Sequence, residues 1–583
     1  MMKKTFLAVL FAFVLVLSLA AGSSQKYYAV SSVEWQTVNT LCHTAGVAGP
    51  SSNGPVTASQ LLYALERAGK YLDGDNAILA GIRAELQDDT SLYCDDIGSV
   101  NLSASLSPEA YVQTGSPYGD DSTLKPSWGL DSDWFLRDHL SRPSAVSLTL
   151  ENTISDYVYS RFTFPYRQKV GDSSAYWNKN FSLSFLGSRP LQNFPIDAGV
   201  SFGAKGVSLI IARGKVSLGE GYTGNTAIGD NYDYQEFMKL GYYTRNTSVF
   251  LNLTSFDSSR NVDYPWQTGI SKFSGYRNLR HSVVYEMVFC DRAKVSVGLI
   301  SMLDTDTAFD FRYLNPFMIL HSMYNFHETS VLEANNLITV DFSWSFLKKW
   351  NFYIQLSSDQ VQITGEAKGY VEEMGYTDPN AFGGLVNISY SDVINNTGLL
   401  NVYAEFVYNM PGMYLNSKYY NSDGSTVTQQ KTDSRCWSQD YLVGYHREEE
   451  YGNSDINYSG YKYGPDCLVV SLGGTWRVPD SWSVSSSVLY MAHGEKGRGT
   501  EVKNYTFEGI DTVDDVWRLA LTGTVEHTLV LKAEGEVALW KYLSLSLGAA
   551  YSYRWNYRNT EGKTFSNLQA YVGFTLSWPG VSV

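Results

Sequence analysis

Apolar and polar side chains alternate one by one along segment after segment from Val100 to the C-terminus. In the segment 566–578 the two faces carry Leu568, Ala570, Val572, Phe574, Leu576 and Trp578 against Gln569, Tyr571, Gly573, Thr575 and Ser577. Because successive side chains of a β-strand point to opposite sides of its sheet, this period of two indicates strands with one apolar face. The alternation recurs at 543–554, 338–346 and 400–410. Strands of about 10 residues are long enough to cross a membrane at a tilt.

The pattern predicts an all-β chain that forms a transmembrane antiparallel β-barrel. About 18 strands are expected, with 16 as the alternative, and an even number keeps both chain ends on the periplasmic side. The expected strands are 98–112, 145–165, 179–187, 196–203, 206–213, 236–244, 248–255, 281–290, 294–302, 336–346, 351–361, 384–391, 399–410, 466–478, 482–492, 515–540, 542–556 and 566–578. A secreted β-sandwich or β-helix is the competing fold.

Composition agrees with the barrel and excludes one class of partner. Charged residues make up 18% of the chain and aromatic residues 14%, which suits strands. The net charge of −15 argues against nucleic acid, because that partner requires clustered Lys and Arg.

The N-terminal region differs from the rest of the chain. Residues 1–22 have two lysines, an apolar run and small residues, as a secretory signal peptide does. Residues 23–97 predict a small helical subdomain. Thr57 or Ser59 is expected to cap one helix, whose apolar positions include Leu61 and Leu65, and Asp75 a second. This subdomain either packs on the periplasmic side or lies as a plug in the mouth of the barrel, which would span 98–583.

The connections between strands and the aromatic residues predict an orientation in an outer membrane of a diderm bacterium. Short connections fall on one side, taken as periplasmic, and most long ones on the other; the link 166–178 is a longish exception on the periplasmic side. Aromatic residues expected at the periplasmic rim are Trp350, Trp476, Trp482, Trp540, Tyr542 and Trp578. Tyr571, Gly573, Leu576 and Trp578 are similar to the C-terminal signal that barrel-insertion machinery recognises, so that machinery and outer-membrane lipid are expected partners.

The middle of the chain, roughly 190–362, resembles the capsule-assembly Wzi family of outer-membrane proteins. The resemblance is carried by Tyr313, Leu314, Asn315, Pro316 and Phe317, by Asn335 and Asn336, by the strand 338–346 with Asp341, by 352–362 with Asp359, and by 281–287 with Glu286. It implies an 18-stranded barrel with an N-terminal helical portion that acts as a lectin and holds capsular polysaccharide at the cell surface. Tyr313, Asn315, Pro316 and Asp341 are expected to be structural. Leu218 to Gly221 stand where the family has a Trp-Gly type motif.

The sequence carries no motif of a known catalytic site. It has no Gly-x-Ser-x-Gly elbow, no His-Glu-x-x-His and no phosphate loop, so we expect no enzyme and no cofactor. Asp304, Asp306 and Asp310 are close enough in sequence to hold calcium, but Asp is common in loops, and no metal is expected. If the five cysteines form bridges, Cys42 with Cys94 and Cys436 with Cys467 are the guesses.

Polar residues on the inward faces and tyrosines in the outer loops bear on function. Alternation places these charged side chains in the lumen: Glu286, Asp341, Asp359, Glu405, Lys532, Glu534, Glu536 and Arg554. They either line a pore or pair with one another and fill the barrel. Aromatic rings stack on sugar faces, so the tyrosines expected to bind a glycan are Tyr414, Tyr419, Tyr451, Tyr458 and Tyr461. The predicted function is a barrel that binds surface polysaccharide and helps its attachment or assembly; the alternative is a porin or transporter gated by the N-terminal helices.

Overall fold

The structure is a computed structural model. It describes residues 24–72, 76–87, 93–94, 98–115, 135–136, 142–166, 177–180, 197–232, 234–256, 279–305, 311–317, 331–361, 365, 368, 379–414, 416–420, 434–438, 442–445, 455–495, 517 and 519–578. The predicted signal peptide, 1–22, lies outside these residues and stays a prediction.

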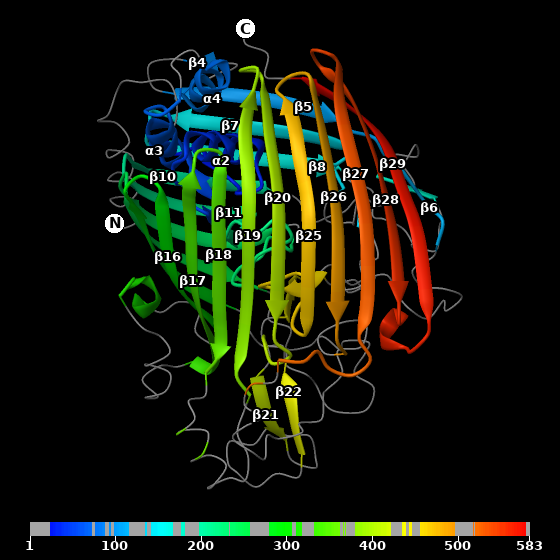
Figure 1. The fold of residues 1–583 in the computed structure, drawn as a ribbon. Helices are drawn as coiled ribbons and strands as arrows, with labels where there is room; N and C mark the ends of the chain where they lie inside the picture. Colours follow the sequence, from blue (N-terminus) through cyan, green and yellow to red (C-terminus); the bar gives the residue numbers. More distant parts are fainter. Residues whose placement is uncertain are drawn as a thin grey trace.

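The chain forms a closed antiparallel barrel of 18 strands, as the alternation predicts (Figure 1). Its strands are β5 Gly98–Leu106 with its continuation β6 Glu109–Gln113, β7 Val146–Ile154, β8 Val158–Tyr166, β10 Asp197–Ala204, β11 Val207–Gly214, β13 Gln235–Tyr243, β14 Thr247–Ser255, β15 Leu279–Phe289, β16 Ala293–Thr305, β17 Val331–Leu347, β18 Trp350–Gln360, β19 Ala381–Ile394, β20 Gly398–Asn409, β25 Cys467–Val478, β26 Trp482–His493, β27 Glu526–Trp540, β28 Leu543–Trp555 and β29 Thr564–Trp578. The barrel closes where β29 pairs with β5 and β6.

Two errors in the predicted strands offset each other in the count. The segment 145–165 is two strands, β7 and β8, joined at residues 155–157. Strand β8 pairs directly with β10, so the wall has no place between them for the predicted strand 179–187. It lies almost entirely outside the described residues. The prediction that the link 166–178 lies on the periplasmic side is also wrong. Strand β8 ends at the rim where the long connections lie, so the chain leaves β8 on that side.

The short connections between strands lie at one rim, which we call the short-turn rim. The long connections lie at the opposite rim, the long-loop rim. The short turns are 155–157, 205–206, 244–246, 290–292, 348–349, 395–397, 479–481 and 541–542. Short periplasmic turns are the rule in such barrels, so we assign the short-turn rim to the periplasm.

The outward faces are apolar and exposed over the whole wall. They include Leu148, Leu150, Phe162, Ile211, Leu240, Val297, Ile338, Val340, Trp344, Leu356, Ile388, Val402, Phe406, Leu472, Val488, Leu531, Leu547, Val572 and Phe574. Exposed apolar side chains in a continuous belt require lipid rather than water around them. The alternation therefore gave the correct face along β17, β28 and β29.

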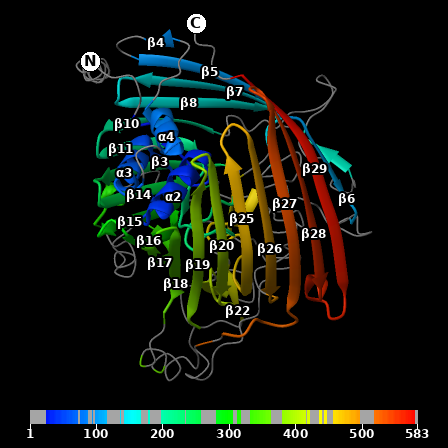
Figure 2. The ribbon, with the colours of Figure 1, turned by 45° about the horizontal axis from the view of Figure 1, so that its top comes forward.

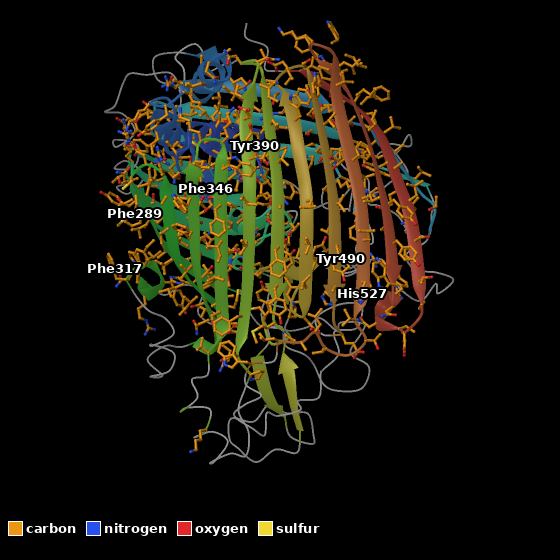
Figure 3. The ribbon with its side chains drawn as sticks, in the orientation of Figure 1. Phe289, Phe317, Phe346, Tyr390, Tyr490 and His527 are labelled. Carbon is orange, nitrogen blue, oxygen red and sulfur yellow. The ribbon has the colours of Figure 1, made fainter. Side chains whose placement is uncertain are left out.

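Aromatic rings stand at both rims of this belt (Figure 3). Phe289, Phe346 and Tyr390 lie toward the short-turn rim, and Tyr490 and His527 toward the long-loop rim. The predicted periplasmic aromatics are confirmed there as contacting pairs: Trp350 with Tyr390, Trp476 with Trp482, and Trp540 with Tyr542. Such rings suit the headgroup level of a membrane.

Within the described residues, three helices precede the barrel: α2 Val33–Ala45, α3 Ala58–Ala68 and α4 Ala77–Gln87. Thr57 is the N-cap of α3, as predicted, and its N–H donates to Gln60 Oε1 at 2.9 Å. For α4 the cap is Asn76, whose Oδ1 accepts from Leu79 N; Asp75 lies outside the described residues. Among the helices that the structure describes, none is long and apolar enough to cross a membrane.

Candidate functional site: the barrel interior

The helices fill one side of the barrel's mouth at its short-turn rim. Figure 2 shows α2, α3 and α4 on the side of the earlier strands, away from β27 to β29. Arg67 of α3 is buried and donates to the carbonyl of Arg245, in a short turn, at 2.7 Å. Lys349 N, in another short turn, donates to His43 O at 2.9 Å, and Ala48 N to Asp291 O at 2.8 Å. These contacts hold the helices against the short turns of the rim.

The chain before α3 reaches into the lumen and meets charged side chains from the wall. Lys239 Nζ donates to Pro55 O at 2.8 Å, and Lys294 Nζ to Pro50 O at 2.5 Å. Ser51 Oγ donates to Glu286 at 3.2 Å. A buried charge is tolerated only when it is paired and hydrogen-bonded, and these contacts supply the bonds.

The connection between β11 and β13, residues 215–234, folds inward. Its strand β12 (Ser217–Leu218) pairs with β2 (Asn53–Gly54) of the N-terminal segment. Glu220 forms a buried ion pair with Lys294 at 2.7 Å. This contact ties the inward connection to the wall strand β16.

Two polar side chains of the wall hold the backbone of this inward connection. Glu405 accepts from Tyr222 N at 2.6 Å and from Thr223 N at 2.8 Å. Gln355 Oε1 accepts from Thr226 N at 2.7 Å, and Gln355 Nε2 donates to Leu218 O at 3.0 Å. Backbone groups that would otherwise be buried without partners are thus satisfied.

Three of the tyrosines predicted to bind a glycan lie in this packed interior. Tyr414, Tyr458 and Tyr461 have no exposed surface. Tyr461 and Thr223 share a hydroxyl hydrogen bond of 2.8 Å, and Tyr461 N donates to Tyr414 Oη at 3.0 Å. The prediction that these rings lie on an accessible surface is wrong. The two ends of the connection between β20 and β25, which carry them, fold into the barrel, and burying an aromatic ring is more favourable than leaving it in water. The side chain of Tyr419, in β21 (Asn416–Tyr420), and Tyr451 lie outside the described residues, so their role stays a prediction.

The family-motif residues Tyr313, Asn315, Pro316 and Asp341 make the following contacts, and their structural role stays a prediction. Tyr313 is buried in η2 (Phe311–Leu314), and its carbonyl is 3.0 Å from His281 Nε2. Tyr285 Oη donates to Pro316 O, and Asn315 Oδ1 accepts from Phe317 N at 3.1 Å. Asp341 lies on the lumen face of β17 and is buried.

The predicted lumen charges are of two kinds. Glu286, Asp341, Glu405 and Arg554 are buried, so here the interior is filled. Lys532 and Glu534 form an ion pair at 2.5 Å and keep exposed side-chain fractions of 29% and 19%. Glu536 is exposed. The lumen is therefore packed in one part and accessible to solvent in another.

Register defines the accessible part, which we name the polar wall. It consists of two neighbouring rows on the lumen faces of β20, β25, β26 and β27: Tyr403, Gly473, Ser487 and Lys532, then Asn401, Thr475, Ser485 and Glu534. All eight residues are at least partly exposed. The next row toward the long-loop rim is nearly closed, since Glu405, Ser471 and Val530 are buried. The space along the polar wall therefore opens toward the short-turn rim.

The guessed disulfides are not formed. Cys42 is a free, buried thiol that donates to Ala64 O at 3.6 Å, and burial raises its pKa to about 12. The buried Cys467 thiol donates to Gly464 O at 3.4 Å. Within the described ranges, no group of three or more His, Cys, Asp or Glu side chains is arranged to hold a metal ion.

Comparison with known proteins supports the fold. No family model and no curated protein matches the sequence. Among solved structures the chain is similar to Wzi of Escherichia coli, described as an outer-membrane protein involved in group 1 capsule assembly and as a carbohydrate-binding β-barrel. The TM-score is 0.54 at 12% identity, over 96% of this chain and 100% of that one. The channel DcaP of Acinetobacter baumannii gives a TM-score of 0.36 at 12% identity, over 84% and 99%, and OprD of Pseudomonas aeruginosa 0.37 at 7%, over 82% and 95%.

Fold and surface together define the class. The protein is a multi-pass outer-membrane β-barrel with its N-terminal helices at the short-turn rim. The predicted resemblance in fold to the Wzi barrel is confirmed.

Proposed function

We propose that this protein is a non-enzymatic barrel that binds a surface polysaccharide and helps its attachment or assembly at the outer membrane. The observation that carries the proposal is the sealed half of the lumen. Between the row of Glu405 and the long-loop rim, lumen-facing side chains such as Val407, Val469 and Met491 are buried against inward-folded connections. A diffusion pore needs an open path there. The likeness to a carbohydrate-binding barrel supports the same proposal.

The porin or transporter is the second candidate, and one observation favours it. The polar wall is accessible to solvent although it faces the lumen. Such a surface would serve as the inner half of a channel if the inward connections moved aside.

The test compares cell-bound with shed polysaccharide in a strain that lacks the gene and in the same strain complemented with it. The proposal expects polysaccharide to be shed without the protein and retained after complementation. A strain that keeps all of its polysaccharide but takes up a small solute more slowly would reject the proposal and favour the transporter.

A further inference from the structure

Tyr222 stands at the tip of the inward connection and marks one end of the polar wall. Its ring stacks on Tyr403, with centroids 3.8 Å apart and planes 3° apart, and its hydroxyl donates to Asn401 Oδ1 at 3.1 Å. Both partners face the lumen. Even so, 38% of the Tyr222 side chain is exposed. A ring held among lumen-facing residues and still exposed must border an internal space.

The floor beside this ring is made of small side chains. Tyr403 lies across Gly473, where a Cβ atom would come within 2.6 Å of the Tyr403 hydroxyl, so glycine is required for this close approach. Ser487 and Ser485 follow on β26, and both are partly exposed. Small residues here leave room for a ligand beside the stacked rings.

The chemistry of the wall selects the kind of ligand. Hydroxyl, amide, ammonium and carboxylate groups offer both donors and acceptors, which suits a polyhydroxylated molecule. The ion pair of Lys532 with Glu534 leaves the two rows without net charge, which does not favour a strongly anionic ligand. Apart from the ring of Tyr403, the two rows carry no large apolar side chain on which an acyl chain would lie.

The geometry points to a saccharide subsite on the polar wall, reached from the periplasm, that takes a neutral or weakly charged segment of the polysaccharide. The Tyr222 ring, held by Tyr403, stacks on a sugar ring, and the serines, Thr475 and the ion pair bind its hydroxyls. This inference rests on the proposed function and gives it a site inside the barrel.

The test uses the full-length protein in detergent, titrated with short oligosaccharides obtained by partial acid hydrolysis of the surface polysaccharide of the bacterium that makes it. Ser485→Trp and Ser487→Trp fill the space beside the rings. Ser486→Trp is the matched control, because Ser486 lies between them in sequence and faces lipid. Tyr222→Ala removes the stacking ring. Gel mobility before and after heating checks that each barrel is folded.

The two lumen-facing tryptophans and Tyr222→Ala should each weaken binding by at least about tenfold, and Ser486→Trp should leave it unchanged. Wild-type protein that binds while all folded variants bind equally well would overturn the subsite and leave the proposed function standing. Wild-type protein that binds none of the oligosaccharides would overturn both.

Discussion

Val488 and Ser487 are neighbours in the sequence of β26, but Val488 faces lipid and Ser487 faces the lumen. Val488 is 43% exposed on the outer face, and Ser487 lies on the polar wall. Arginine at the bilayer midplane costs about 2–4 kcal/mol, whereas in a wet lumen it keeps its hydration. Val488→Arg should therefore lower the folded fraction in the outer membrane, and Ser487→Arg should be much milder. Quantitative gels of unheated and heated membranes measure this, and equal losses would contradict the assigned faces.

Ser343 illustrates why such pairs must be chosen from the structure. Alternation places Ser343 in the lumen, and the structure agrees. It is nonetheless almost fully buried, with Asn351 Oδ1 at 3.3 Å from its hydroxyl. An arginine there would meet packed protein rather than water. Sequence period predicts which face a residue takes, but it does not predict whether that side of the wall is filled.

Glu405 anchors the inward connection. It accepts two backbone N–H groups, and a hydrogen bond to a charged group contributes about 1.5–3 kcal/mol. Glu405→Ala should release residues 219–228, which hydrogen exchange would detect as faster exchange of their amides. Glu536→Ala removes an exposed lumen carboxylate instead and is the control. Unchanged exchange in Glu405→Ala would mean that the connection is held by other contacts.

At the scale of elements, helix α2 and the turn between β7 and β8 escaped prediction for two different physical reasons. Helix α2 is buried on almost all sides, between α3 and β18 to β20, so its sequence lacks the apolar stripe of a half-exposed helix. The turn that divides β7 from β8 contains no Gly or Pro; Ser155 takes a positive φ of 51° there. By contrast, α3 has one buried face and a capping residue, and its sequence predicts both.

Docking of α2 should depend on pH through His43. Burial lowers the pKa of His43 to about 4, whereas an exposed histidine titrates near 6.5. Below about pH 6.5 the undocked state binds a proton that the docked state does not, so docking weakens as the pH falls, by about 3 kcal/mol at pH 4. Hydrogen exchange of residues 33–45, corrected for its intrinsic pH dependence, should rise between pH 7 and pH 5. The variant His43→Leu should lack most of this rise, and an equal rise in both proteins would exclude His43 as the cause.

At the scale of the whole molecule, the sequence predicts those features that the surrounding membrane imposes. Contact with lipid requires one apolar face on every strand. The alternation of apolar and polar residues therefore predicts both the positions and the number of the strands from β10 to β29. The packing of the barrel interior requires no such repeating pattern of residues. Its filling depends on contacts such as that of Glu220 with Lys294, 74 positions apart, whose partners no local pattern connects. For this reason the tyrosines at 414, 458 and 461 were expected outside and lie inside.

Conductance separates the binding barrel from a helix-gated transporter. The helices fill only one side of the short-turn rim, whereas the inward connections with Tyr461 and Thr223 close the lumen beyond the polar wall. In a planar bilayer the full-length protein should therefore carry no steady current. A variant lacking residues 26–87, taken from the fraction that folds by the gel-mobility criterion, loses the β2–β12 pairing but should stay closed, because Glu405 and Gln355 of the wall still hold the inward connection. If it conducts while the full-length protein does not, the helices are the gate and the transporter replaces the binding barrel. If a variant with 219–229 replaced by a Gly–Ser linker conducts only when the helices are also removed, the helices close the short-turn rim as well, and the polar wall is not reached from the periplasm.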